Sequence, residues 1–213
     1  MKCVLFSRPK HDDTMEYLYF YSKELLSLSE SLGLKTINKE KEDANKKVVS
    51  DIIISQKPNL IMFNGHGSEN TICGHKNEII VSSENVGLLA GSITYALACS
   101  SGLELGKEAK DKGAIVFIGY KYDFSIGRDP NSEASPRMDK IAKHFLEPSN
   151  LLVSCLLKGK IVKEAITKAK EKMKDSIGYF STTKDFPEAP HYAPYLYGNY
   201  TGLIAHGDEE VCI

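Results

Sequence analysis

The chain has 213 residues, 42% of them hydrophobic and 26% charged, and this composition predicts one globular domain over residues 1–213. Its formal net charge is −1 and it has no long basic run, so we expect no nucleic-acid partner. Apolar stretches reach about six residues, whereas a membrane helix needs roughly 20. We therefore expect no membrane partner. The N-terminus lacks the basic region and the small-residue cleavage site of a signal peptide, so we expect no signal peptide either.

Five cysteines are scattered along the chain: Cys3, Cys73, Cys99, Cys155 and Cys212. Disulfide frameworks of secreted domains are denser and use even numbers of cysteines. We therefore expect reduced thiols and a cytoplasmic protein. The odd number also leaves one cysteine free to be reactive.

The chain opens with a strand-like segment. Residues 3–6 are continuously apolar, as a strand covered on both faces must be. A long helix follows, capped near Asp13 or Thr14 and ended by Gly33. One face of this helix carries Leu18, Leu25, Leu28 and Leu32. Residues 36–37 predict a further strand.

A second helix precedes Pro58 and leads into the next strand. Its apolar residues recur at i, i+1, i+4 and i+5, which favours a helix over a strand: Val48, Val49, Ile52 and Ile53. Residues 60–63 and 93–98 are again short and continuously apolar, so each predicts a buried strand.

The second half of the chain continues this alternation. Residues 102–112 predict a third helix, and residues 115–118 predict a strand. Residues 122–136 and 181–194 are polar and contain prolines, so both are interpreted as surface loops. Between these loops, residues 161–173 predict a helix whose inward face carries Ile161, Val162, Ala165, Ile166, Ala169 and Met173.

The order strand, helix, strand, helix, strand determines the predicted fold class. Right-handed crossovers would join these strands into a mainly parallel sheet with helices on both faces. We therefore predict an α/β fold.

Reactive side chains follow two of the predicted strands. His66 lies in a glycine-rich turn after residues 60–63, and Cys99 directly follows residues 93–98. In open α/β sheets, ligands bind outside the carboxyl ends of the strands. If these two strands are parallel neighbours, a histidine and a cysteine emerge side by side at that edge.

Cys99 is a better nucleophile than any nearby serine because a thiol ionises more easily than a hydroxyl. A helix that begins just after Gly102 would favour the thiolate further. The alternatives are a core cysteine that merely ends a strand and a histidine in a solvated turn. His66 and Cys99 occur together, each after an apolar strand and in this order, and this combination favours a catalytic pair.

Two short blocks carry a resemblance to a known family. Residues 63–68 (FNGHGS) resemble the histidine block of the caspase-like superfamily, and residues 96–102 (ALACSSG) resemble its cysteine block. This group of cysteine peptidases, clan CD, includes caspases, metacaspases, gingipains, separases and CHAT domains. The resemblance implies a three-layer α/β/α sandwich with a mainly parallel central sheet of about six strands.

Within this superfamily, the chain is most similar to CHAT domains, with gingipain-like peptidases as the next match. The CHAT resemblance rests on a Gly-Ala strand at residues 113–119, followed by Tyr120 and Asp123. It also rests on an aromatic stretch at residues 190–192 before a strand that ends in Gly-Asp at residues 207–208. The chain departs from CHAT domains in having no tryptophan.

The resemblance implies a thiol protease that needs no cofactor and no metal. Cys99 would attack the scissile carbonyl, and His66 would protonate the departing amine and then help to activate water. The backbone N–H groups of Gly67 and Cys99 would bind the oxyanion. The sequence identifies no third member of a catalytic triad.

The substrate pocket is predicted in three different ways. Asp123 follows a core strand and would bind a basic side chain, as an acidic residue in the equivalent loop does in separases. Arg8 follows the first strand, where caspases place an arginine that binds acidic side chains. Leu97 and Tyr120 would instead line an apolar pocket. The alternative for Asp123 and Arg8 is a solvated loop charge.

Other polar features are interpreted structurally. Cys73 and His75 lack a second pair of residues at metal-ligand spacing, so we expect a hairpin around residues 76–77 rather than a metal site. His191 and His206 are expected to be structural histidines.

We therefore expect an endopeptidase that cuts a protein or peptide substrate and that works with a regulatory protein partner. A binding or scaffold module that has lost activity is the alternative, but inactive relatives usually lose the cysteine or the histidine. A third reading is a ligand-binding or redox protein that uses Cys99 without cleaving peptides.

Overall fold

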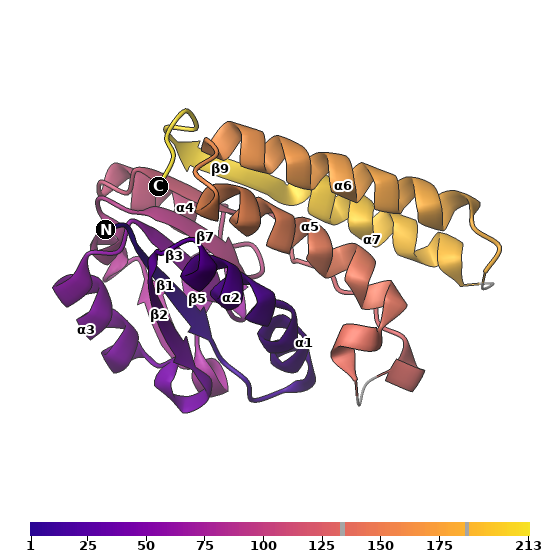
Figure 1. Cartoon of the computed structure of the whole chain (residues 1–213), viewed down its shortest axis with the longest axis horizontal. Coiled ribbons are helices and arrows are strands. Elements are labelled where there is room, and N and C mark those ends of the chain that lie inside the picture. Colours follow the sequence, from indigo (N-terminus) through magenta and orange to yellow (C-terminus); the bar gives the residue numbers. More distant parts are fainter. Residues whose placement is uncertain (133–134, 186–187) are drawn as a thin grey trace.

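The structure is a computed structural model that describes residues 1–132, 135–185 and 188–213 (Figure 1). Six strands form the central sheet in the order β2-β1-β3-β7-β8-β9. They are β1 (Cys3–Arg8), β2 (Lys35–Glu40), β3 (Leu60–Asn64), β7 (Ile93–Leu97), β8 (Val116–Tyr120) and β9 (Leu203–Gly207). All neighbouring strands are parallel except β8 and β9. The predicted mainly parallel sheet is thus confirmed.

Both faces of this sheet are covered, because alternate side chains of each strand enter different cores. Val4 and Phe6 of β1 pack into one core, while Leu5 packs into the other. The same alternation in β3 sends Met62 to the first core and Ile61 to the second. This two-sided burial explains the continuous apolar runs of the sequence.

Five helices contribute to the first core, and Figure 1 shows them on one side of the sheet. They are α1 (Asp13–Tyr21), α2 (Lys23–Ser31), α5 (Lys140–Leu157), α6 (Val162–Thr182) and α7 (Ala189–Gly202). The second core lies beneath α3 (Lys46–Gln56), α4 (Leu105–Asp111) and a small antiparallel sheet. Helix, sheet and helix layers therefore form an α/β/α sandwich, as predicted.

The small antiparallel sheet contains β4 (Gly67–Ser68), β5 (Thr71–Cys73) and β6 (Ile79–Ser82). The turn between β5 and β6 contains Lys76 and Asn77, both with positive φ. The predicted hairpin around residues 76–77 is therefore confirmed. Short 3₁₀ turns complete the chain: η1 (Lys41–Asp43), η2 (His75–Asn77), η3 (Val86–Leu89), η4 (Pro130–Ser132) and η5 (Pro136–Met138).

The helix predicted from Asp13 or Thr14 to Gly33 is in fact two helices, because Ser22 interrupts it. The Ser22 hydroxyl donates to the Leu18 carbonyl (2.7 Å) and accepts from Arg8 Nε (2.8 Å). A serine hydroxyl bonded to the carbonyl four residues earlier bends a helix. The buried Arg8 reinforces this break.

The structure differs most from the sequence-based predictions in the C-terminal third, which is helical. The sequence predicts no element where α5 lies and a loop at residues 181–194, whereas α6 extends to Thr182 and α7 begins at Ala189. Both unrecognised helices contain an internal proline, Pro148 in α5 and Pro194 in α7. The loop at residues 122–136 contains no α-helix or strand where it is described, although residues 133–134, like residues 186–187, lie outside the described part of the chain.

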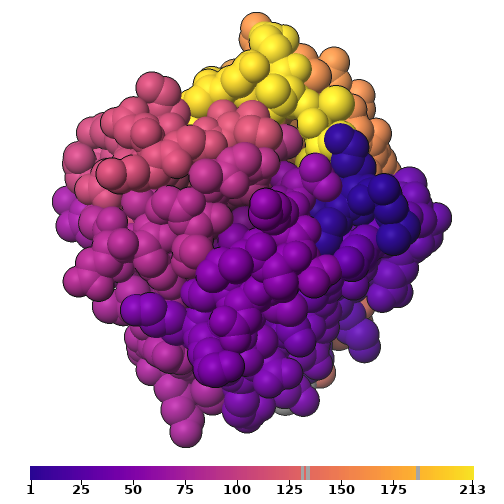
Figure 2. All heavy atoms as spheres, turned by 90° about the vertical axis from the view of Figure 1, so that its left-hand side faces the viewer, coloured from indigo at the N-terminus to yellow at the C-terminus, as the bar shows by residue number. Residues whose placement is uncertain are grey.

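The amino ends of the parallel strands lie at one end of the molecule. Figure 2 views this end and shows N-terminal residues (indigo) close to C-terminal residues (yellow). The carboxyl ends, where the candidate site lies, are on the opposite side. Within the described residues, no helix has both the length and the apolar character needed to cross a bilayer.

Candidate active site

The structure brings His66 and Cys99 to the same edge of the sheet. Strands β3 and β7 are parallel neighbours, with Asn64 opposite Leu97 in the register. The Gly65 N–H donates to the Leu97 carbonyl (3.3 Å), so the two loops leave the sheet side by side. The carboxyl ends of parallel strands are where α/β folds bind their ligands.

Gly67 packs the histidine loop directly onto the cysteine loop. A Cβ at Gly67 would lie 2.9 Å from Ala98 Cβ and 3.0 Å from the Cys99 carbonyl oxygen, so the two loops touch at a distance that only glycine permits. On its other side, Gly67 pairs with Ile72 of β5, and the Cys73 N–H donates to the His66 carbonyl (2.9 Å). By the alternation of an antiparallel ladder, the Gly67 N–H therefore points away from β5.

Cys99 lies in a turn that is held by the loop after β8. Cys99 is partly exposed, unlike the buried Cys3 and Cys155. The next residue, Ser100, has a left-handed conformation with φ of 54°. Ser100 holds this turn by donating its N–H to the Tyr122 carbonyl (3.1 Å) and its hydroxyl to Asp123 (2.9 Å).

Burial raises the pKa of the Cys99 thiol, and the negative charge of Asp123 raises it further. The backbone N–H groups of Phe124 and Cys99 act in the opposite direction but do not overcome these effects. The expectation that a helix start would favour the thiolate is therefore wrong. Helix α4 begins only at Leu105, too far along the chain to dominate.

Asp123→Asn is expected to move the alkylation profile of Cys99 to lower pH, because it removes a charge that disfavours the thiolate. The amide keeps an oxygen that can accept from Ser100. Iodoacetamide rates, measured by site-resolved mass spectrometry from about pH 6 to about pH 10, would show the shift. The exposed Cys212 serves as an internal reference. A Cys99 profile that stays in place or moves to higher pH would contradict the assignment.

Asp12 is a site residue that the sequence reasoning missed. It caps helix α1 by accepting the Met15 N–H (2.9 Å) with Oδ1, and its Oδ2 lies 2.8 Å from His66 Nε2. Burial opposes ionisation of Asp12, but the bonds from Met15 and His66 outweigh it and lower the pKa of this carboxyl. A carboxylate can only accept, so the His66 Nε2–H donates and Nδ1 of a neutral His66 is left as the basic nitrogen.

The position of Asp12 follows from the strand order. The chain runs outward from β1 to β2 in one direction and from β3 to β7 and β8 in the other. Asp12 follows β1 and His66 follows β3, so the two residues flank the point where the strand order reverses, the usual ligand crevice of such sheets. The helix-cap pattern near residues 12–14 was visible in the sequence, but the pairing of β1 with β3 was not.

Three of the four predicted substrate-binding residues are buried. Arg8 is 1% exposed and bonded to Glu40 (3.1 Å), while Leu97 and Tyr120 are 3% and 1% exposed and pack in the first core. These placements speak against direct contact with a substrate. Asp123, in contrast, is exposed beside the Cys99 turn.

The loop that supplies the Phe124 N–H to Cys99 continues into a cavity of about 470 Å³. The cavity is lined by Ser125, Ile126, Gly127, Arg128, Pro130, Tyr192 and Tyr195. Arg128 stacks over the Tyr17 ring at 5.7 Å. The lining begins one residue after Phe124, so this cavity lies along the same loop as that N–H donor.

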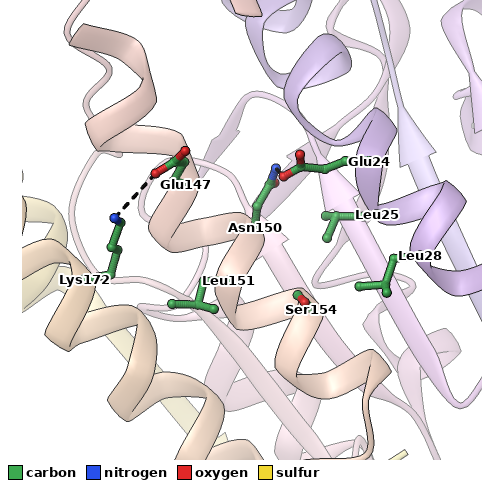
Figure 3. Close-up of a pocket in the computed structure, with 8 residues that line it drawn as sticks. All are labelled: Glu24, Leu25, Leu28, Glu147, Asn150, Leu151, Ser154 and Lys172. Atoms are coloured by element: carbon green, nitrogen blue, oxygen red, sulfur yellow. Dashed lines mark hydrogen bonds and ion pairs between the residues drawn. The ribbon is translucent and has the colours of Figure 1, made fainter. Parts of the chain in front are cut away.

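A second cavity, of about 500 Å³, lies between α2, α5 and α6 (Figure 3). Its lining joins the leucines Leu25, Leu28 and Leu151 with an Asn150–Glu24 hydrogen bond (2.8 Å) and a Lys172–Glu147 ion pair (3.6 Å). No cysteine or histidine lines it. Ser154 lines it without a histidine, so its described lining offers no cysteine–histidine or serine–histidine pair for peptide hydrolysis.

The two histidines expected to be structural make no hydrogen bond to His66 or Cys99 among the described residues. His206 donates to the Gly102 carbonyl (2.8 Å), which confirms a structural role. His191 is exposed in the first turn of α7.

Comparison with known proteins places this fold. No family model and no curated protein matches the sequence. Among solved structures, the Arg-specific cysteine proteinase gingipain R (RgpB) superposes over 100% of this chain with a TM-score of 0.65 at 12% identity. The fold is similar to that of gingipain R. The RgpB of Porphyromonas gingivalis in a complex of its pro- and mature domains matches with a TM-score of 0.56 at 15% identity.

This likeness confirms the predicted caspase-like α/β/α fold, because the six-stranded, mainly parallel sheet and its flanking helices match the fold of gingipain R. The chain spans less than half of the matched gingipain chains, 47% and 48% of their lengths. None of these comparisons supports the finer resemblance to CHAT domains.

Proposed function

We propose that the protein is a cysteine endopeptidase in which Cys99 is the nucleophile, His66 the acid–base residue and Asp12 the residue that orients His66. The observation that carries this proposal is the placement of a partly exposed cysteine and a carboxylate-paired histidine on adjacent strand ends. A fold similar to that of a known cysteine proteinase supports it.

The raised pKa of Cys99 shapes the mechanism. The resting thiol keeps its proton at neutral pH, so His66 Nδ1 accepts that proton as Sγ attacks the substrate carbonyl. Asp12 stabilises the imidazolium that forms, since its carboxylate is bonded to Nε2. His66 then gives the proton to the departing amine, and water hydrolyses the thioester to regenerate the thiol.

The negative charge that develops on the carbonyl oxygen also needs hydrogen-bond donors. We assign this role to the N–H groups of Gly67 and Cys99, because Gly67 points its N–H away from β5 and touches the Cys99 backbone. One such donor contributes about 3 kcal/mol of transition-state stabilisation.

Asp123 supports a preference for a basic side chain before the cut bond. It is exposed next to the Cys99 turn, whereas Arg8 is buried in an ion pair. A carboxylate there would attract Lys or Arg. A protein substrate in a reducing compartment suits the five free thiols of the chain, and we extend the proposal to a cytoplasmic location.

A positional-scanning peptide library, incubated with the purified full chain, tests the activity and the preference together. We expect cleavage after Lys or Arg, with covalent labelling of Cys99 by a peptidyl electrophile that carries the preferred residue. Preference for Asp or Glu would contradict the role of Asp123 and point to Arg128. If no peptide is cleaved and no label reaches Cys99, the chain is an inactive scaffold module instead.

A further inference from the structure

A cluster of potential metal ligands lies at the reversal point of the strand order. His11, Asp12 and His66 each present a ligand atom within 4.8 Å of the others. His66 Nε2 lies 2.8 Å and His11 Nε2 lies 3.3 Å from the same oxygen, Asp12 Oδ2. Ligands of a tetrahedral zinc ion, at bond lengths of about 2.0–2.1 Å, are roughly 3.3 Å apart. The two separations from Asp12 Oδ2 are near that value, and all three ligand atoms lie within 4.8 Å of one another.

His11 has a side chain that its neighbours hold in place, as the side chain of a metal ligand usually is. Its side chain is 9% exposed, and its ring packs edge-on against His66 (6.1 Å) and His75 (5.4 Å). Nε2 faces two acceptors, Asp12 Oδ2 and Asn77 Oδ1 (3.2 Å), while Nδ1 is buried without a hydrogen-bond partner among the described residues. A buried imidazole that aims one nitrogen at two oxygens is preorganised for a cation at that nitrogen.

We propose that His11, Asp12 and His66 form a regulatory binding site for a transition-metal ion of the zinc class. Two imidazoles and one carboxylate suit Zn²⁺, whereas Ca²⁺ and Mg²⁺ prefer oxygen ligands. Three protein ligands leave a coordination position open, unlike the closed sets of four ligands that hold structural zinc.

The consequence for catalysis rests on the proposed function. A neutral imidazole that binds zinc through Nε2 carries its proton on Nδ1. His66 would then have no free nitrogen to accept the Cys99 proton, and Asp12 would ligate zinc instead of supporting the imidazolium. Zinc would therefore switch the peptidase off, and a chelator that removes it would switch the peptidase on.

Binding is tested without any need for activity. Isothermal titration of ZnCl₂ into the full-length Cys99→Ala chain is expected to show one site per chain, because the proposed ligands exclude the thiol. His11→Asn in the same background should weaken binding at least about tenfold, since it removes one ligand. His191→Asn, which changes an exposed histidine outside the cluster, serves as the matched control and should bind like its parent.

Two binding results would overturn the proposal. One is His11→Asn binding zinc as tightly as its parent. The other is stoichiometric binding by the wild-type chain that Cys99→Ala abolishes, because the ion would then be bound by the thiolate.

If the wild-type chain cleaves peptide, zinc should inhibit the cleavage and EDTA should restore it. His11→Asn, compared with its own zinc-free rate, should resist inhibition. If the chain cleaves no peptide, the titrations still decide whether the metal site exists.

Discussion

Cys99→Ala and His66→Ala are each expected to reduce peptide cleavage by about 10³-fold or more while leaving the fold intact. The alanine at position 99 removes the atom that forms the thioester. The alanine at position 66 removes the group that accepts the thiol proton, which the raised pKa of Cys99 makes necessary. Initial rates on the best library peptide, with circular dichroism and thermal unfolding, measure both effects.

Cys73→Ala provides the matched control for the loss of a thiol. Cys73 is partly exposed like Cys99, and burial raises its pKa in the same way, but it lies in β5 of the small sheet. This variant should keep its activity within a small factor. Cleavage at a wild-type rate by either active-site variant would remove the peptidase proposal, and equal losses in all three would indicate a general structural effect.

The parts of the fold that were predictable are those with local sequence signals. Strands β1, β3, β7 and β8 were visible because burial on both faces leaves each as an apolar run. Helix α3 was visible from its apolar spacing before Pro58. The two reactive residues were found because each directly follows such a strand.

The parts that failed depend on contacts between distant segments. Helix α5 contains Pro148 and buries Ser149 and Asn150, and the Asn150 amide donates to the Tyr21 carbonyl (2.8 Å) of α1. Those polar residues obscure the apolar pattern until the partner is known. Arg8 was similarly ambiguous, since only the folded chain shows it buried beside Glu40 of β2 rather than open to substrate.

Asp12 was missed for the same reason, because its contact with His66 joins distant segments of the chain. Replacing Asp12 gives the sharpest test of the catalytic geometry. Asp12→Asn is expected to lower kcat about 100-fold with little change in KM, because an amide cannot stabilise the imidazolium of His66. Asn is as good a helix cap as Asp, so α1 should keep its start and thermal stability should change little.

The matched control is Asp13→Asn, which removes the same charge one residue further along the first turn of α1. A pH profile of kcat that is altered in Asp12→Asn but not in Asp13→Asn would mark an effect on proton transfer. Equal activity of the two variants would mean that the hydrogen bond between Asp12 and His66 does not contribute to catalysis.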